Sequence, residues 1–581
     1  MISVERSFYE KFPQFAAGRA RSFSQPVVDL LRRVACEERI NATLASLAPC
    51  TGFDFVERAL EQFRVSYSFA NTDRENIPVE GRVVIVANHP LGAFDALALI
   101  HLVGSVRRDV KILANDVLMQ LEPLSSLLLP LPVFGAGSAL GGAREAYRAL
   151  DRDEALIVFP AGEVSRMRPN GVRDSAWSPG FARLAMKTDA PVLPVHIAAQ
   201  NSPLFYGASM LAKPLASLLL AREMFGASKA RIGFNVGELV PCKALNDSEL
   251  APASVAAHMR RHVYRLARRR PTVFPTSSAI AHPESPLAVR SALRRAERLG
   301  ETHDRKQILL LDSVQDCPAM RELGRLRELA FRRVGEGTGA RRDLDRFDGH
   351  YRHLVLWDEN ALAIVGAYRL GEARTILAER GTEGLYSSTL FDYANPAPAF
   401  LHDAVELGRS FIQPAYWNSR SLDALWQGIG AYLRARSDVR YLFGPVSLTA
   451  ALPGPAREWI AHYHRHYFGD SDALARARNP FVISREVAVA AEAEWAGRAP
   501  DEGFARLRAR LDALDAQLPT LYRQYVDLCE PAGVRFLDFG IDPSFGGCVD
   551  GLVRLDIEHL RAAKRARYLK PRPAVVPASL A

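Results

Sequence analysis

A histidine and an aspartate with the spacing of a proton-accepting pair follow the first strongly apolar run of the chain. His89 and Asp95 lie in the stretch 88–95, directly after Val83–Ala87. An aspartate that holds one imidazole nitrogen leaves the other able to take a proton from an attacking hydroxyl. The same stretch fits equally a plain turn, Asn-His-Pro followed by glycine, that happens to contain a histidine. The apolar run predicts a strand, and its carboxyl end lies at the edge of a parallel sheet where active-site loops gather.

Two further segments favour chemistry over a plain turn. Ile157–Ser165 predicts a strand that runs into a turn of small residues, and Ala190–Val195 follows it. In this order the three segments resemble the blocks of the glycerolipid acyltransferases, the lysophosphatidic-acid acyltransferases and their relatives, over residues 80–240. The resemblance implies that His89 and Asp95 are catalytic. The acceptor-site residues that it implies are Asn88, Phe159, Pro160, Gly162, Glu163 and Ser165.

The sequence departs from that family within these blocks. Five residues separate His89 from Asp95, one more than in the family, so the loop must have a different shape if the pair is to meet. Ala161 stands where the family has a glutamate, and Glu163 follows two residues later.

The family also has a block whose arginine is the natural ligand of a glycerol phosphate. The nearest apolar turn in this sequence, residues 132–135, lacks that arginine. We therefore expect the acceptor to be a lipid hydroxyl without such a phosphate. The alternative is that another arginine has taken over, and the candidates are Arg144, Arg166 and Arg168.

A second group of chemistry-bearing residues lies in the C-terminal half. It comprises Arg327, Phe331, Asp345, Asp348, Arg369, Glu406 and Arg409. Singly, these side chains fit a solvated helix face, a charged turn and a surface ion pair. As a set, they resemble the acyl-homoserine-lactone synthases, which are carrier-protein-dependent relatives of the GNAT N-acetyltransferase fold. The ornithine N-acyltransferase branch is closer still, over about 307–570, with similar endings at Tyr525–Leu528, Phe539–Phe545 and Val549–Leu552.

That resemblance implies attack of an amine on a thioester. Glu406 would accept the amine's proton or orient the amine, with Arg409 beside it as the second catalytic residue. Backbone N–H groups at a splayed strand would stabilise the acyl oxygen. The acceptor, an amino acid with a free carboxylate, would be bound by an ionic lattice. We expect its members to be Arg327, Arg369 and Arg409 with Asp345 and Asp348, and we expect Phe331 beside them.

The sequence also bears on the acyl donor. Coenzyme A users of this fold carry Gln/Arg-x-x-Gly-x-Gly/Ala at a helix start, and Gln427–Tyr432 matches this only in part. It lies inside the predicted helix 422–434, so we interpret its glycines as packing positions. We expect the donor to be an acyl carrier protein, acting as co-substrate, and we expect no bound cofactor.

The composition of the chain bears on its partners and on its location in the cell. Lys+Arg 74 against Asp+Glu 65 gives a formal net charge of +9. This excess suits an anionic partner, whether phosphate, membrane head groups, nucleic acid or an acidic carrier protein, and does not choose among them. Six cysteines without regular spacing indicate reduced thiols. We find no signal peptide and no run of roughly 18 apolar residues. We expect a cytoplasmic protein, peripheral on the inner face of the cell membrane, that binds amino-acid and lyso-lipid substrates.

The pattern of strands and helices predicts an α/β chain with two domains. Residues 1–80 predict a helical extension, 81–265 an acyltransferase-like α/β domain with a largely parallel sheet, and 307–581 a GNAT-like α+β domain. The stretch 266–306 is basic and proline-rich and predicts a linker, with a basic helix at 288–299.

Two other features carry weaker predictions. The histidines of His462–His466 would not all share one helix face, so we expect no metal site. The basic stretch 260–270 lacks the interleaved aromatic residues of a nucleic-acid surface. We expect no nucleic-acid partner and predict a solvated helix or a contact with anionic lipid there.

Two acyltransferase domains on one chain resemble the bifunctional ornithine-lipid synthases. The resemblance implies that the C-terminal domain N-acylates ornithine with a 3-hydroxyacyl group and that the N-terminal domain O-acylates the new hydroxyl. One alternative is a glycerophospholipid acyltransferase whose C-terminal half only recruits carrier protein. Another is a hemolysin-like protein that binds membranes without turnover.

Overall fold

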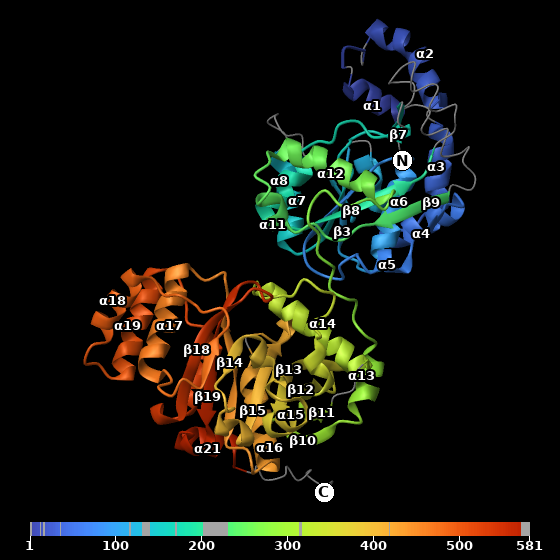
Figure 1. The fold of residues 1–581 in the computed structure, drawn as a ribbon. Coiled ribbons are helices and arrows are strands. Elements are labelled where there is room, and N and C mark those ends of the chain that lie inside the picture. The colour runs from blue at the N-terminus through green and yellow to red at the C-terminus, as the bar shows by residue number, and fades with distance from the viewer. Residues whose placement is uncertain are drawn as a thin grey trace. The chain divides into compact units, whose positions relative to one another are not determined.

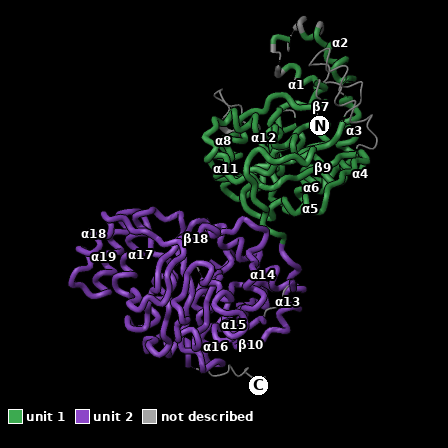
Figure 2. Tube along the Cα trace, in the orientation of Figure 1, with its two compact units in different colours: residues 1–282 green, residues 283–581 purple. Residues whose placement is uncertain are grey.

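The structure of the chain, a computed structural model, consists of two compact units, residues 1–282 and 283–581 (Figure 2). It describes residues 3–11, 13–15, 18–34, 36–115, 118–130, 140–168, 171–200, 231–312, 316–417 and 419–570. The turn at 132–135 lies outside the described residues. Within the predicted linker, residues 286–293 are a helix and 297–301 a strand of the second unit, so the prediction of a linker over 266–306 is wrong in its C-terminal part.

Unit 1 is built on a seven-stranded sheet in the order β1-β9-β8-β2-β5-β3-β4. β8 and β9 are antiparallel and the other neighbours are parallel. The predicted α/β class with a largely parallel sheet is therefore confirmed. The strands are β1 (Ser66–Ser68), β2 (Val83–Ala87), β3 (Val110–Ala114), β4 (Leu128–Pro130), β5 (Ala155–Val158), β8 (Val192–Ala198) and β9 (Arg231–Val236).

Helices cover both faces of this sheet (Figure 1). Successive side chains of a strand point to opposite faces, so Val83 and Ile85 pack in the core beneath α4 and α6, while Val84 and Val86 pack beneath α7, α8 and α12. The helices are α1 (Val4–Lys11), α2 (Gly18–Val34), α3 (Glu37–Ser46), α4 (Gly52–Gln62), α5 (Asn71–Arg74), α6 (Ala93–Gly104), α7 (Leu140–Asp151), α8 (Gly180–Thr188), α11 (Cys242–Asn246) and α12 (Pro252–Leu266). A small hairpin, β6 (Arg166–Arg168) and β7 (Gly171–Arg173), precedes α8.

Unit 2 is built on an eight-stranded sheet in the order β10-β11-β12-β13-β15-β16-β19-β18. Its neighbours are antiparallel except β15 and β16, which are parallel. The strands are β10 (Glu297–Glu301), β11 (Gln307–Leu311), β12 (Arg352–Asp358), β13 (Ala363–Glu372), β15 (Ala404–Ile412), β16 (Tyr441–Leu448), β18 (Val534–Asp542) and β19 (Cys548–Asp556). A separate pair is formed by β14 (Phe391–Tyr393) and β17 (Ala475–Ala477).

The parallel strands β15 and β16 separate soon after they begin. They pair only from Ala404 opposite Tyr441 to Glu406 opposite Phe443. At the next residue, Gly444, an added Cβ would lie 2.1 Å from the carbonyl oxygen of Leu407, so only glycine fits there. Beyond this point the facing backbone groups of the two strands no longer bond to each other, which is the splay that the family resemblance implies.

Helices pack on both faces of the unit 2 sheet (Figure 1). In α16, a Cβ on Gly428 would lie 2.9 Å from the Leu354 side chain and one on Gly430 would lie 2.1 Å from Tyr568 O, so both glycines are packing positions. The helices are α13 (Pro286–Leu293), α14 (Pro318–Arg333), α15 (Ala373–Arg380), α16 (Ser421–Ala435), α17 (Gly454–Phe468), α18 (Arg485–Trp495), α19 (Pro500–Ala513), α20 (Thr520–Leu528) and α21 (Ala562–Tyr568). Among the described helices of both units, none combines the length and the apolar character needed to cross a bilayer.

Two candidate active sites

The loop between β2 and α6 brings His89 and Asp95 together. His89 lies two residues after the end of β2, and Asp95 lies in the first turn of α6. Gly92, with φ 81°, supplies the left-handed backbone that lets the longer loop turn into the helix. The imidazole Nδ1 of His89 lies 3.3 Å from Oδ2 of Asp95. The extra residue therefore does not separate the pair.

Asp95 is held rigidly behind the histidine. Its side chain is buried, and Oδ2 accepts hydrogen bonds from the backbone N–H groups of Leu91 at 2.6 Å and Gly92 at 3.1 Å. Burial raises the pKa of Asp95, while His89 and the two N–H groups act in the opposite direction. The carboxylate can thus orient the ring through Nδ1, which leaves Nε2 as the nitrogen able to take a proton.

The turn Phe159–Gly162, which we call the Phe-Pro-x-Gly block, lies directly beside this histidine. The rings of Phe159 and His89 stack with centroids 4.1 Å apart, and the backbone N–H of Ser165 donates to His89 O at 2.8 Å. Gly162 has φ 64° and allows the turn, while Pro160 O accepts from Ser178 N at 2.8 Å. The fold therefore brings Phe159 and Ser165 to the histidine.

Two of the predicted acceptor-site residues are engaged elsewhere. The amide of Asn88 bonds both ways with the backbone of Ile197, donating at 2.9 Å and accepting at 2.7 Å. Asn88 therefore ties the end of β2 to β8, and its polar atoms serve the fold. Glu163 forms an ion pair with Arg166 at 2.8 Å.

Asp174 belongs to this site, although the sequence motifs did not indicate it. Its buried Oδ1 accepts from the backbone N–H of His89 at 3.2 Å and from the Ser165 hydroxyl, and Oδ2 accepts from Trp177 Nε1 at 2.7 Å. One carboxylate thus joins the histidine loop to the Phe-Pro-x-Gly block. No motif marks it, because its role depends on a contact across 85 positions of the chain.

In unit 2 the predicted ionic residues form a buried lattice. Arg327 of α14 is buried and donates from Nη1 to Asp348 at 2.8 Å, so the simpler interpretation as a solvated helix face is wrong. Its Nη2 lies 3.1 Å from Nδ1 of His353. Burial lowers the pKa of His353 to about 3, so its neutral ring can accept from the guanidinium.

Asp345 and Asp348 stabilise a turn within this lattice. Asp345 Oδ1 accepts from Phe347 N at 2.8 Å, and Asp348 Oδ2 accepts from Asp345 N at 2.8 Å. Arg369 of β13 donates to Asp345 at 2.7 Å. Burial alone would raise the pKa of Asp348, yet the charges of Arg327 and Arg369 hold it well below its usual value. This carboxylate is therefore ionised at neutral pH.

Glu406 lies where β15 and β16 separate, and protein donors occupy both of its oxygens. Oε1 accepts from Ser387 N at 2.7 Å, while Oε2 accepts from the Tyr351 hydroxyl and from Tyr386 N at 3.1 Å. Burial raises the pKa of Glu406, and these hydrogen bonds oppose the rise. With its oxygens occupied, Glu406 is better suited to hold the 386–387 segment than to take a proton.

Arg409 reaches the lattice because β15 bulges at this point. The strand pairs Gly408 with Arg369 but Phe411 with Ala367, and Arg409 has a left-handed φ of 49°. Its Nε lies 3.0 Å from Asp343 Oδ2 and its Nη1 donates to the Tyr386 hydroxyl at 3.0 Å. The interpretation of Glu406 and Arg409 as a surface ion pair is therefore wrong, since each is bound to other partners in the interior.

Aromatic rings close one side of the lattice. The Arg409 guanidinium carbon lies 5.0 Å from the centre of the Phe545 ring, and Phe331 packs edge-on against Phe545 with centroids 5.2 Å apart. Phe331 therefore reaches the predicted cluster through Phe545. Asp343, Tyr386 and Phe545 were missed from the sequence, because only the folded sheet brings them to the arginine.

Asp550 is a further carboxyl group near the splayed strands; it lies in the Val549–Leu552 segment of the resemblance but was not predicted as a site residue. It is buried, and Oδ1 accepts from the hydroxyl of Ser447, on the part of β16 that β15 no longer pairs. Burial raises the pKa of Asp550 to about 6, with Asp542 adding to the rise and Arg409 opposing it. Burial likewise raises the pKa of Glu336 to about 7, helped by Asp550. Groups of this kind can change protonation state near neutral pH.

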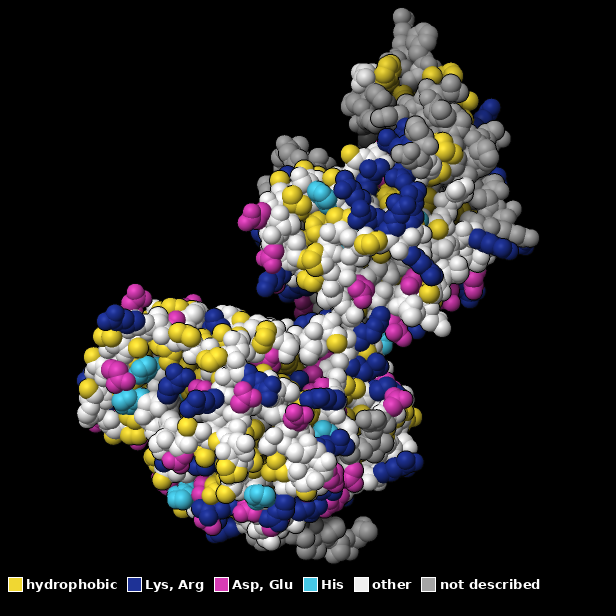
Figure 3. Space-filling model, in the orientation of Figure 1, with side chains coloured by type: hydrophobic (Ala, Val, Ile, Leu, Met, Phe, Trp, Pro, Cys, Tyr) yellow, Lys and Arg dark blue, Asp and Glu magenta, His cyan; other side chains and the backbone are white. Residues whose placement is uncertain are grey.

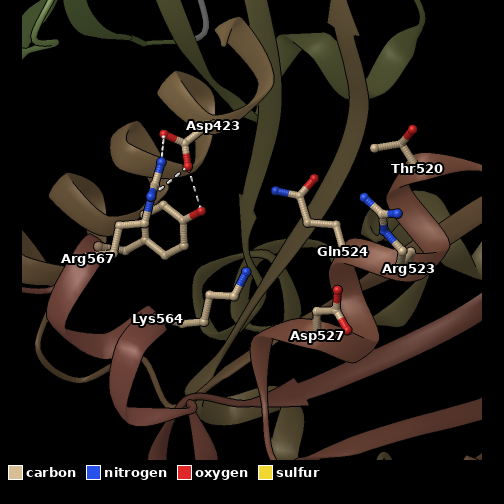
Figure 4. A pocket seen from close by; sticks show the side chains of 8 residues that line it. Asp423, Thr520, Arg523, Gln524, Asp527, Lys564 and Arg567 are labelled. Atoms are coloured by element: carbon tan, nitrogen blue, oxygen red, sulfur yellow. Dashed lines mark hydrogen bonds and ion pairs between the residues drawn. The ribbon is translucent and has the colours of Figure 1, made fainter. Parts of the chain in front are cut away.

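A separate pocket of about 320 Å³ lies between α16, α20 and α21 (Figure 4). Asp423 binds Arg567 at 2.7 Å and the Tyr568 hydroxyl at 2.8 Å. The pocket offers Arg523 and Lys564, with the carboxylate of Asp527 also in its lining.

The histidines of α17 are part of the packing of that helix. His464 is buried, with Nδ1 2.7 Å from Ile460 O, whereas His462 and His466 lie 3.6 and 3.8 Å from Glu492. The expectation that the three histidines do not share one helix face matches this arrangement, in which His464 has other contacts than His462 and His466.

Comparisons with known proteins match both halves of the chain. A family model described as "Acyltransferase" matches residues 7–267, and one described as "Acetyltransferase (GNAT) domain" matches residues 326–427. A lyso-glycine lipid O-acyltransferase of Bacteroides thetaiotaomicron is 31% identical over 273 residues, covering 46% of this chain and 97% of the relative. A glycine N(alpha)-acyltransferase of Phocaeicola vulgatus is 28% identical over 305 residues, covering 50% and 92%. An L-ornithine N(alpha)-acyltransferase of Brucella abortus is 35% identical over 170 residues, covering 26% and 57%.

The fold and these matches define the class of protein: an enzyme that transfers acyl groups. The chain belongs to the acyltransferase family, with an N-terminal acyltransferase domain and a C-terminal GNAT domain. The two family resemblances inferred from the motifs are confirmed at this level.

Proposed function

We propose that this chain builds a diacylated amino-acid lipid in two steps. Unit 2 acylates the amine of an amino acid with a 3-hydroxyacyl group, and unit 1 acylates the hydroxyl of that product. The observation that carries the proposal is the presence of both sites on one chain, a His89–Asp95 pair at 3.3 Å and the buried lattice around Arg369. The relatives support it, because their names include both an O-acyltransferase and N-acyltransferases.

In the O-acyl step, His89 takes the proton of the lipid hydroxyl through Nε2 as that oxygen attacks the acyl thioester. Asp95 fixes the ring through Nδ1 and stabilises the imidazolium that forms. The stacked ring of Phe159 limits the tilt of the imidazole. The proton then passes to the departing thiolate, so that the histidine ends the cycle neutral.

In the N-acyl step, the amine attacks the thioester in the gap between β15 and β16. Backbone N–H groups of the splayed strands stabilise the acyl oxygen as charge develops. Arg369 and Arg409 bind the acceptor's carboxylate, while Glu406 positions the 386–387 segment. Asp550 takes the amine's proton, a role supported by its buried position next to Ser447 and its pKa of about 6. The C–S bond of the thioester then breaks, and the departing thiolate takes this proton from Asp550, so that the carboxylate ends the cycle ionised.

Glycine and ornithine are the two candidate acceptors, since relatives of both kinds match the chain. We propose an acyl carrier protein as the donor, because a chain of net charge +9 complements an acidic carrier. We propose that a carrier phosphate binds at Arg523 and Lys564, in the pocket that Asp527 also lines. We also propose peripheral attachment to the inner face of the cell membrane.

Lipid analysis of a bacterial host that makes no aminolipids tests the proposal. On expression of the full chain, mass spectrometry should reveal a new monoacylated and a new diacylated amino-acid lipid. Labelled glycine and labelled ornithine, fed separately, identify the acceptor. An altered glycerophospholipid profile without aminolipid would favour a glycerophospholipid acyltransferase. An unchanged profile, with the chain expressed and soluble, would contradict both acyltransferase proposals.

A further inference from the structure

The β6–β7 hairpin of unit 1 is attached directly to the residues around His89. β6 begins immediately after Ser165, and β7 ends immediately before Asp174. Ser165 N bonds to His89 O, and Asp174 accepts from His89 N. Whatever the hairpin binds is therefore held next to the histidine.

Four arginines gather at this hairpin. Three lie on its strands and one on α12, and together we call them the arginine cluster: Arg166, Arg168, Arg173 and Arg260. Arg166 stands directly opposite Arg173 in the strand register. The guanidinium carbons of Arg173 and Arg260 lie 5.2 and 5.8 Å from the centre of the Tyr264 ring. Figure 3 shows Lys and Arg side chains collected on the face of unit 1 that it presents.

The described part of unit 1 supplies little negative charge to balance this cluster. Arg166 is paired with Glu163. Asp174, the carboxylate next along the chain, accepts only from the neutral donors of His89, Ser165 and Trp177. Glu163 and Asp174, which flank the hairpin along the chain, are therefore two carboxylates against four arginines. Like charges directly opposite each other on paired strands are destabilising. The arrangement therefore favours an anion from outside the chain.

The same hairpin carries an exposed apolar side chain. Met167, between Arg166 and Arg168 on β6, is 44% exposed and lies with Val172 on the opposite face of the hairpin from Arg166, Arg168 and Arg173. A hairpin with guanidinium groups on one face and an exposed apolar side chain on the other suits the interface of a bilayer, where guanidinium groups bind lipid phosphates and the thioether enters the acyl region. An acidic protein surface would balance the arginines but would leave the methionine without an apolar partner.

We propose that the arginine cluster and Met167 dock unit 1 on an anionic lipid surface. The acceptor then reaches His89 from the bilayer instead of crossing water, a consequence that rests on the proposed O-acylation. The docking itself does not depend on turnover, so it can be tested without activity.

Co-sedimentation of the full chain with vesicles tests the docking. Phosphatidylcholine vesicles are compared with vesicles that also contain phosphatidylglycerol, at low and high salt. Each cation near an anionic surface contributes about fivefold in partitioning. The double variant Arg168→Gln/Arg173→Gln should therefore bind phosphatidylglycerol vesicles roughly 25-fold more weakly than the wild type. Met167→Ser should weaken vesicle binding at high salt as well, because charge is screened there and the apolar contact remains.

Two controls separate docking from other effects. Arg58→Gln/Arg148→Gln removes the same charge from exposed ion pairs on α4 and α7 and should change binding no more than about twofold. His89→Ala should bind vesicles like the wild type, so failure of the proposed chemistry is distinguishable from failure of docking. Wild-type vesicle binding by a folded Arg168→Gln/Arg173→Gln variant would overturn the proposal. So would a variant that keeps vesicle binding but loses binding to acyl carrier protein, which would assign the cluster to a protein partner.

Discussion

Asp174 Oδ1 accepts a hydrogen bond from the backbone N–H of His89 at 3.2 Å, and the same oxygen accepts the hydroxyl of Ser165. The carboxylate is buried and does not belong to any of the motifs that pointed to this site. It joins the loop after β2 to the loop after β5, so the position of the histidine depends on it.

Replacing Asp174 by asparagine should impair O-acylation without abolishing folding. An amide oxygen can still accept one bond, but its NH₂ group would face existing donors, which costs about 1–3 kcal/mol. We expect kcat for O-acylation to fall about 10- to 100-fold with a smaller change in KM, because the substrate pocket is intact and the base is displaced. Ser165→Ala, which removes one donor, should have a weaker effect. An Asp174→Asn enzyme with wild-type kcat would show that the contact does not position the histidine.

Substitutions of Glu406 or Arg409 should abolish the first step, N-acylation, because both side chains have buried partners. Glu406→Gln would turn an amide NH₂ toward the N–H of Ser387 or Tyr386, and Arg409→Ala would leave Asp343 buried without its guanidinium. Either change should abolish both the monoacylated and the diacylated lipid. Glu301→Gln, in an exposed ion pair, is the matched control and should retain both products. Near wild-type lipid levels in a folded Glu406→Gln or Arg409→Ala enzyme would remove these residues from the N-acylation site.

The raised pKa of Asp550 predicts how the free energy of unfolding depends on pH. Because burial raises its pKa to about 6 in the folded chain, above about 3.9 for an unfolded aspartate, the native state binds this proton more tightly. The resulting stabilisation is fully present below about pH 4 and is lost as the pH rises through about 6. Asp550→Asn should therefore gain about 1–2 kcal/mol relative to the wild type between pH 5 and pH 8.

Urea unfolding of the full chain at both pH values measures this change. Asp312→Asn, whose side chain is 72% exposed, should differ from the wild type by no more than about 0.5 kcal/mol at either pH. The proposed role of Asp550 as proton acceptor also requires that its asparagine variant lose N-acylation. Equal pH dependence in the Asp550→Asn and wild-type proteins would contradict the raised pKa.

The choice of donor predicts a dependence on ionic strength. A chain of net charge +9 that binds an acidic carrier should lose affinity as salt rises. We expect kcat/KM with acyl carrier protein to fall several-fold between about 50 and about 300 mM salt, and little activity with acyl-coenzyme A. Lys564→Gln should reduce the salt effect if the pocket of unit 2 binds the carrier. Equal rates with the two donors would argue against carrier dependence.

The parts of the structure that were predictable are those that follow from position along a strand. His89 and Phe159 follow β2 and β5, which are neighbours in a parallel sheet, so their proximity could be inferred from the sequence. Asp174 and Asp343 could not be inferred, because each meets its partner only through the folded chain. The predicted linker failed in its C-terminal part because residues 297–301, which overlap the end of the predicted basic helix 288–299, pair with β11 as a strand of the unit 2 sheet. Only this pairing with a later segment shows that they belong to the second unit.

The measurement that tests the central claim most directly is the lipid profile of His89→Ala, with Asp95→Asn beside it. Removing the imidazole takes away the base in unit 1 but leaves the lattice of unit 2 unchanged. The monoacylated aminolipid should therefore accumulate while the diacylated lipid disappears, and Asp95→Asn should have the same effect less completely because a misoriented imidazole keeps some basicity. If His89→Ala still makes the diacylated lipid, or loses the monoacylated one as well, the division of the two steps between the two units is contradicted.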